Sequence, residues 1–127
     1  MKILITTAAL FITFHAFPQT SINNTKWKGL ITSPQSLEIV LEFKADSLRV
    51  TSMEGTELEV MYFLLNKDTL TLKKLNGTSP CDNVTEGAYL LRWIENGDKF
   101  QMLTIKDDCR ARSNSITSEY ACARVKD

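Results

Sequence analysis

Histidine is almost absent from this sequence. The only one, His15, lies in an apolar leader that we expect to be removed. The mature chain would then have no imidazole to act as a general base or as a zinc ligand. This excludes Ser-His-Asp and Cys-His catalysis and zinc sites that use histidine.

Long hydrophobic runs are also scarce. The longest, residues 3–14, follows Lys2 and gives way to polar residues at Gln19. A positive start, an apolar stretch of about a dozen residues and a polar boundary are typical of a secretory signal peptide. The run is shorter than the roughly 20 apolar residues that a membrane-spanning helix needs. The alternative, a buried N-terminal element, lacks an amphipathic period. We therefore expect a signal peptide at residues 1–19 and a secreted or periplasmic domain at residues 20–127, without membrane insertion.

Neither sign of charge is in excess. Without Lys2, which leaves with the leader, the chain has 14 basic and 15 acidic residues, a net charge of −1. Such a balanced and scattered distribution offers no electrostatic surface for nucleic acid or for anionic membranes. No linker rich in Pro, Gly or Ser divides the chain after the leader, so its length corresponds to one domain.

The sequence is rich in short stretches in which apolar and polar residues alternate. The clearest has Leu37, Ile39, Leu41 and Phe43 on one face. Because side chains alternate between the two faces of a strand, this pattern predicts a half-buried strand. The expected strands are residues 27–32, 37–43, 47–53, 58–65, 69–75, 87–94, 99–105 and 117–125.

Short turns join most of these strands, which predicts antiparallel neighbours. Asn96-Gly97 is a strong hairpin signal because both residues accept left-handed backbone conformations. We therefore predict an all-β fold, an antiparallel up-and-down barrel of about eight strands, with a two-sheet sandwich as the alternative. Residues 76–86 are the longest irregular stretch, and residues 107–114 have room for one helical turn.

Three cysteines remain after the leader, and in an oxidising compartment disulfides persist. They allow three single-bridge pairings, and the sequence alone does not select one. We favour Cys81–Cys109, because both lie in polar, loop-like surroundings where a bridge would connect the two irregular segments. Cys122 lies between two alanines in a strand pattern and is predicted to be a buried small apolar residue rather than a reactive thiol.

Three motifs in the second half of the chain occur together. They are Cys81, the Gly-x-Tyr pattern of residues 87–89 and the Asp-x-Cys-x-x-Arg pattern of residues 107–112. This combination resembles small bacterial lipocalin-like proteins. The resemblance covers about residues 80–125 and the entry strand at Trp27, and it implies a lipocalin-like barrel.

The wider lipocalin and calycin group has a Trp in the first strand and an Arg in the last strand that packs across it. Trp27 and Arg124 are the matching residues here. The resemblance implies that the Arg124 guanidinium lies over the Trp27 indole, a cation–π contact worth about 0.5–2 kcal/mol. It also gives Asp107 and Arg112, with the two bridged cysteines, a structural role.

The first functional hypothesis is a non-catalytic binding module, because a small barrel can hold one small apolar molecule. Six aromatic residues are candidates to line such a pocket or, the reading we favour for most of them, to fill the core. They are Trp27, Phe43, Tyr62, Tyr89, Trp93 and Phe100.

The second hypothesis is an extracytoplasmic protein-interaction module, of an inhibitor or immunity type, with a filled core. It depends on Met61, Phe63 and Leu65, in a strand that is apolar on both faces. For Asp107 and Asp108, a turn that caps backbone amides and pairs with an Arg is favoured over a carboxylate hydrolase. We expect a monomer with no enzyme activity, no cofactor and no metal site, whose partner is a small apolar molecule or a protein.

Overall fold

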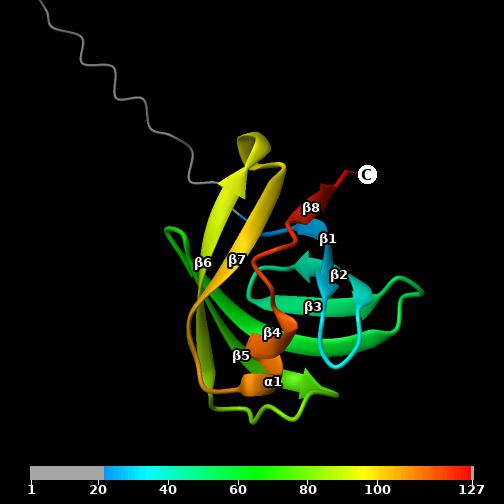
Figure 1. The fold of residues 1–127 in the computed structure, drawn as a ribbon, viewed down its shortest axis with the longest axis vertical. Helices are drawn as coiled ribbons and strands as arrows, with labels where there is room; N and C mark the ends of the chain where they lie inside the picture. The colour runs from blue at the N-terminus through cyan, green and yellow to red at the C-terminus, as the bar shows by residue number, and fades with distance from the viewer. Residues whose placement is uncertain (1–21, 127) are drawn as a thin grey trace, which may run out of the picture.

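The computed structural model describes residues 22–126, so the predicted signal peptide at residues 1–19 lies outside the described residues. Eight strands form one closed antiparallel barrel, in which each strand pairs with the next and β8 returns to β1 (Figure 1). This confirms the predicted up-and-down barrel over the sandwich. The strands are β1 (Thr25–Ile31), β2 (Leu37–Phe43), β3 (Ser47–Ser52), β4 (Glu57–Asn66), β5 (Thr69–Gly77), β6 (Glu86–Ile94), β7 (Lys99–Asp107) and β8 (Cys122–Val125).

The first seven strands lie within two residues of their predicted bounds, but the eighth does not. The prediction of a strand from residue 117 is wrong, since β8 begins only at Cys122. Its pairing with β7 is limited to two positions, at Lys99 and Phe100. The preceding residues connect helix α1 (Arg110–Ser115) to the barrel wall instead of extending the sheet. Helix α1 is the helical turn expected in this region.

The β6–β7 connection confirms the hairpin predicted at Asn96-Gly97. Asn96 has a φ of 58° and Gly97 a φ of 86°, and both are part of the 3₁₀ turn η1 (Glu95–Gly97). Both residues therefore adopt the left-handed conformation that the hairpin signal requires.

Large aromatic side chains fill the barrel interior near the start of β1. Trp27 and Phe100 are fully buried. The Trp27 ring centroid is 4.7 Å from that of Phe100, and the Trp93 centroid lies 5.5 Å from Phe100 and 5.9 Å from Trp27. These edge-to-face contacts leave this part of the interior filled, as predicted for most of the aromatic residues.

Strand β4 has apolar residues on both faces. The residues predicted as a possible contact surface, Met61, Phe63 and Leu65, include two that face the barrel interior. Met61 and Phe63 point into the barrel and are almost fully buried. That prediction is wrong for these two residues, because the register of β4 turns them toward the core. Leu64 points outward and is 53% exposed.

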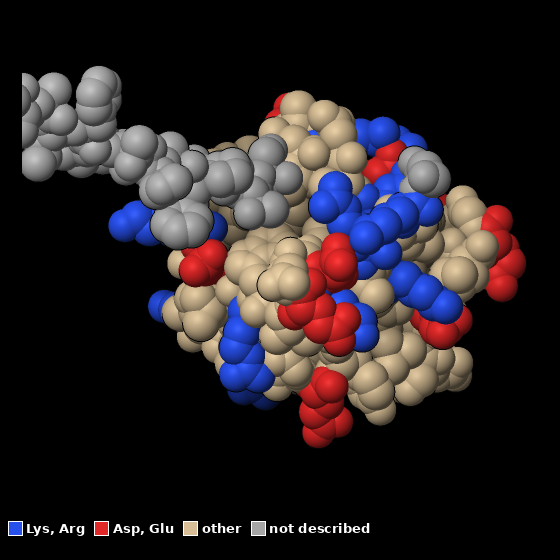
Figure 2. All heavy atoms as spheres, turned by 90° about the horizontal axis from the view of Figure 1, so that it is seen from above, with Lys and Arg blue, Asp and Glu red and all other residues tan. Residues whose placement is uncertain are grey.

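Figure 2 views the molecule from the end near the start of β1, where positive and negative side chains lie side by side. A shallow polar depression there is lined by residues that include Lys26, Lys44, Arg124 and Glu42. No helix within residues 22–126 is long and apolar enough to cross a membrane.

Candidate ligand cavity

The interior of the barrel is hollow at the end opposite the aromatic cluster. A cavity of about 660 Å³ begins among the inward side chains of β2, β3 and β5 and continues to the end that α1 covers. This size is within the range of about 300–1,000 Å³ that is typical of small-molecule sites. The part of the wall formed by these strands is apolar and includes Ile39, Leu41, Phe43, Leu48, Leu70 and Leu72.

Small side chains create part of this space. Gly29 faces inward on β1, and a Cβ atom built there would lie 3.1 Å from the Cys122 Sγ. Ala111 on α1 is another short lining residue. A side chain at position 29 would displace Cys122, and a larger residue at position 111 would extend into the cavity.

Sulfur atoms contribute to the cavity wall. Met61, Met102 and Cys122 all line it. Thioether side chains are flexible and polarisable, so they adapt to ligands of irregular shape. Burial raises the pKa of the Cys122 thiol to about 12, so this group stays protonated and behaves as a small apolar residue. This agrees with the prediction from its alanine neighbours.

The mouth of the cavity is more polar than its depth. Exposed residues such as Pro34, Thr78, Pro80 and Tyr120 line it, so the cavity opens to solvent here. An apolar depth with a polar, open mouth suits a ligand that has an apolar body and a polar end.

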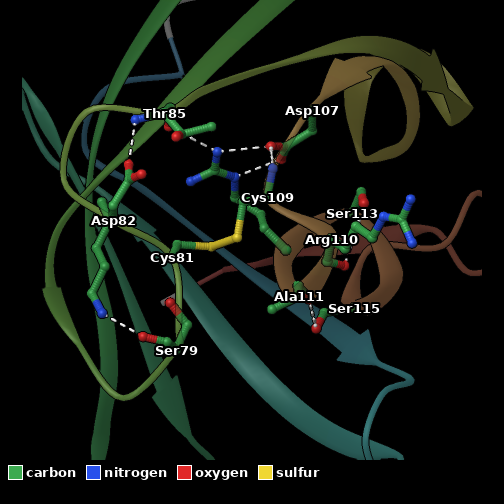
Figure 3. The surroundings of a disulfide bond; sticks show 12 residues. Ser79, Cys81, Asp82, Thr85, Asp107, Cys109, Arg110, Ala111, Ser113 and Ser115 are labelled. Atoms are coloured by element: carbon green, nitrogen blue, oxygen red, sulfur yellow. Dashed lines mark hydrogen bonds and ion pairs between the residues drawn. A yellow bond between two sulfur atoms is a disulfide. The ribbon is translucent and has the colours of Figure 1, made fainter.

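Helix α1 lies across this end and is attached at three places. The Cys81–Cys109 disulfide, drawn in Figure 3, joins the residue that caps its N-terminus to the loop after β5, which confirms the favoured pairing. The Ser115 carbonyl accepts a hydrogen bond from the Thr32 amide at 3.3 Å. Arg112 donates through Nη2 to the Thr85 carbonyl at 3.0 Å. Helix α1 is therefore fixed to the barrel by one disulfide and by hydrogen bonds.

The motifs of residues 87–89 and 107–112 form a single structural unit around Asp107. Its side chain is completely buried and accepts hydrogen bonds from the Tyr89 hydroxyl and, at 2.9 Å, from the Cys109 amide. Arg112 binds it through two nitrogens, Nε at 2.6 Å and Nη2 at 2.9 Å. Gly87 makes room for this carboxylate, because a Cβ there would lie 2.3 Å from the Asp107 Oδ2. The predicted capping and pairing role of Asp107 is confirmed.

These contacts shift the pKa values of all three partners. Burial alone would raise the pKa of Asp107, but the hydrogen bonds from Arg112, Tyr89 and Cys109 outweigh it and hold that pKa below its ordinary value. Burial and the adjacent Asp107 carboxylate raise the pKa of Tyr89. Burial opposes the charge of Arg112, yet the contact with Asp107 raises the pKa of Arg112. Asp107 and Arg112 are therefore a buried ion pair at neutral pH.

The other charged lining residue among those described is Glu59. Its carboxylate accepts from the Ser79 amide at 3.0 Å and from the Ser79 hydroxyl at 2.8 Å. The Lys74 Nζ lies 3.9 Å away. Glu59 thus orders the rim of the cavity and has partners on both oxygens.

The six aromatic candidates are distributed over the molecule, and the cavity brings only Phe43 into its wall. Trp27, Tyr89 and Phe100 are buried elsewhere, and Trp93 packs against Trp27 and Phe100. Tyr62 lies on the outer face of β4, where the Lys73 Nζ is 5.4 Å from its ring centroid. The Arg124 guanidinium lies 5.9 Å from the Trp27 ring centroid, as the resemblance implied.

Sequence reasoning missed most of the wall, which is aliphatic. Leu, Ile and Val residues at inward positions give the same alternating signal whether they face a cavity or a filled core. Arg112 was assigned a structural role, and its place in the cavity wall had no signal in the sequence. Among residues 22–126 no group of three or more His, Cys, Asp or Glu side chains could hold a metal ion.

The comparisons with known proteins assign no relative to this chain. No family model, no curated protein and no solved structure matches it.

Proposed function

We propose that this protein is an exported, monomeric, non-catalytic binding protein of lipocalin-like type, which holds a small apolar molecule in its barrel. The observation that carries the proposal is the apolar cavity of about 660 Å³ that opens at the α1 end. A core built only for stability would be close-packed, because an unfilled volume lined by apolar side chains lowers the free energy of unfolding. A ligand that fills the cavity would restore the apolar contacts that the empty volume lacks.

The disulfide supports the exported location. Disulfides such as Cys81–Cys109 persist in oxidising compartments and are rare in reducing ones. The alternative of a protein-interaction module with a filled core has lost its main support, since Met61 and Phe63 face inward.

The proposal is tested by titrating the purified protein with N-phenyl-1-naphthylamine, a neutral apolar probe whose fluorescence rises in apolar surroundings. We expect saturable binding of one probe per chain with a micromolar Kd. Val50→Phe places a larger side chain in the cavity wall and is expected to weaken binding at least tenfold.

Val40→Phe is the matched control, since Val40 lies on the neighbouring strand between the inward-facing Ile39 and Leu41 and points outward. It should leave the Kd unchanged. Thermal unfolding of both variants shows that they are folded. Absence of saturable binding to the folded wild-type protein would contradict the proposal and direct attention to the outer surface.

A further inference from the structure

Arg112 is the only cationic residue that lines the cavity among the described residues, and its hydrogen bonds are incomplete. A guanidinium has five N–H donors on three nitrogens. Nε and Nη2 are used by Asp107 and by the Thr85 carbonyl. Nη1, with its two N–H groups, is buried and has no hydrogen-bond partner among residues 22–126.

The unpaired Nη1 lowers the stability of the folded protein when no ligand is bound. The Arg112 side chain is only 6% exposed, so Nη1 is withdrawn from bulk water. Leaving a buried donor unpaired costs about 1–3 kcal/mol, and more when the group is charged. Buried polar groups in folded proteins nearly always have partners, so an unpaired one calls for an explanation.

The neighbouring acceptors are already occupied. The Asp107 oxygens accept from Tyr89, Cys109 and the other two nitrogens of Arg112. The Glu59 oxygens accept from Ser79. The carboxylate of Asp82, which also interacts electrostatically with Arg112, is exposed and accepts from the Val84 and Thr85 amides. Arg112 is itself part of the cavity wall, so a ligand in the cavity can bring an acceptor to it.

We propose that the ligand is a single-chain amphiphile with one carboxylate, of the fatty-acid type, and that its carboxylate accepts a hydrogen bond from Arg112 Nη1. This rests on the proposed function. The alkyl chain lies among the apolar wall residues that keep some free surface, such as Leu41, Val50 and Met102, and the carboxylate lies toward the α1 end. The wall closes over Nη1, so a side chain that covers it moves aside when the carboxylate arrives.

A carboxylate fits these donors better than other polar groups do. Hydrogen bonds between a guanidinium and a carboxylate are charge-assisted and about twice as strong as neutral ones. An ester or an alcohol gains only the neutral bond. A phosphate brings more charge and more acceptor oxygens than the single free nitrogen of Arg112 can satisfy, because Asp107 already neutralises the rest of that side chain.

The test is competition for bound N-phenyl-1-naphthylamine by dodecanoate, methyl dodecanoate and 1-dodecanol at pH 7.5, with dodecanoate below its micellar concentration and the other two below their solubility limits. The three competitors have the same chain and differ in the polar end. We expect dodecanoate to compete at least tenfold more strongly than the ester or the alcohol. Equal competition by all three would overturn the carboxylate assignment and leave the apolar pocket standing. Failure of the probe itself to bind would overturn the proposed function.

A second measurement locates the contact. Arg112→Lys removes Nη1, and we expect dodecanoate to lose its advantage while methyl dodecanoate binds as before. Should the variant fail to fold, the ¹³C signal of carboxyl-labelled dodecanoate on wild-type protein answers the question. A carboxylate that binds Arg112 should have its pKa lowered relative to the free acid. An unchanged or raised pKa would contradict the contact.

Discussion

At the scale of single residues, Asp107 connects the structural elements at the α1 end of the barrel. It is fully buried and connects β6, β7 and α1 through Tyr89, Cys109 and Arg112. A buried ion pair contributes little net stability when both partners are present, because both lose their hydration. Loss of one partner is expensive, since it leaves the other charge unpaired in the interior.

Asp107→Asn should therefore lower the free energy of unfolding by about 3 kcal/mol at pH 7. The pKa of Asp107 is below its ordinary value in the folded state, so its contribution is complete above the unfolded pKa of about 3.9 and is lost as the pH falls through the folded pKa. We expect the difference between wild type and variant to shrink in the acid range below about pH 4. Urea unfolding at pH 7 and pH 3 measures it.

The control is Asp108→Asn, the adjacent and exposed carboxylate. It should change stability by less than about 0.5 kcal/mol, as is usual for surface substitutions. An equal loss from both variants would mean that the general charge of this turn, and not the buried pair, stabilises it.

At the scale of elements, the disulfide compensates for the small size of α1. A helix of six residues has no stability of its own, and its attachment to the loop after β5 depends on Cys81–Cys109. The bridge spans 28 residues, so its main effect is to restrict the unfolded chain.

Replacing Cys81 and Cys109 together by Ser should lower the free energy of unfolding by about 3 kcal/mol. Urea unfolding of the double variant, compared with wild type under oxidising and reducing conditions, measures the loss. Wild type in reducing agent should approach the variant. A double variant as stable as the oxidised wild type would show that Arg112 and Ser115 hold α1 without the bridge.

The eighth strand, β8, is the one whose predicted start was wrong. Strands β1 to β7 are paired along most of their length, so the alternating pattern and the sheet agree. In the segment before β8, Thr117 and Tyr120 line the cavity mouth, because the chain must first cross from α1 to the wall. The position at which β8 begins depends on its pairing with β1 and β7, which the local sequence does not show.

At the scale of the whole molecule, Cys122 reports on the cavity. Its thiol is one of the wall groups, and burial raises its pKa to about 12, so the reactive thiolate is scarce at pH 8. In the native protein we expect labelling by a disulfide reagent to be at least a hundredfold slower than in urea. Saturating N-phenyl-1-naphthylamine should slow it further.

Mass spectrometry after labelling in urea without reductant should find one modified thiol per chain, at Cys122, because Cys81 and Cys109 are bridged. Cys122→Ser is the control and should give none. Labelling in the native protein that is fast and insensitive to the probe would mean that this part of the wall is accessible without ligand, and that the probe binds elsewhere.

How much could be predicted depends on the range of the interactions involved. Strand positions, antiparallel order and the hairpin at residues 96–97 follow from local alternation and turn chemistry, and the structure confirms them. The favoured disulfide is confirmed too, because Cys81 and Cys109 lie in the two segments that a small barrel leaves irregular. Of the aromatic candidates for the pocket, only Phe43 reaches the cavity.

The amino-acid sequence by itself thus determined the all-β architecture, since each strand is specified by side chains adjacent to it in the chain. Only the tertiary structure decided that one end of the barrel is filled and the other hollow. That outcome depends on which residues meet across the closed sheet, such as the aromatic pair Trp27 and Phe100 at one end and Gly29 opposite Cys122 toward the other. The place of Arg112 in the cavity wall is likewise a result of packing between α1 and the strands, which no local pattern encodes.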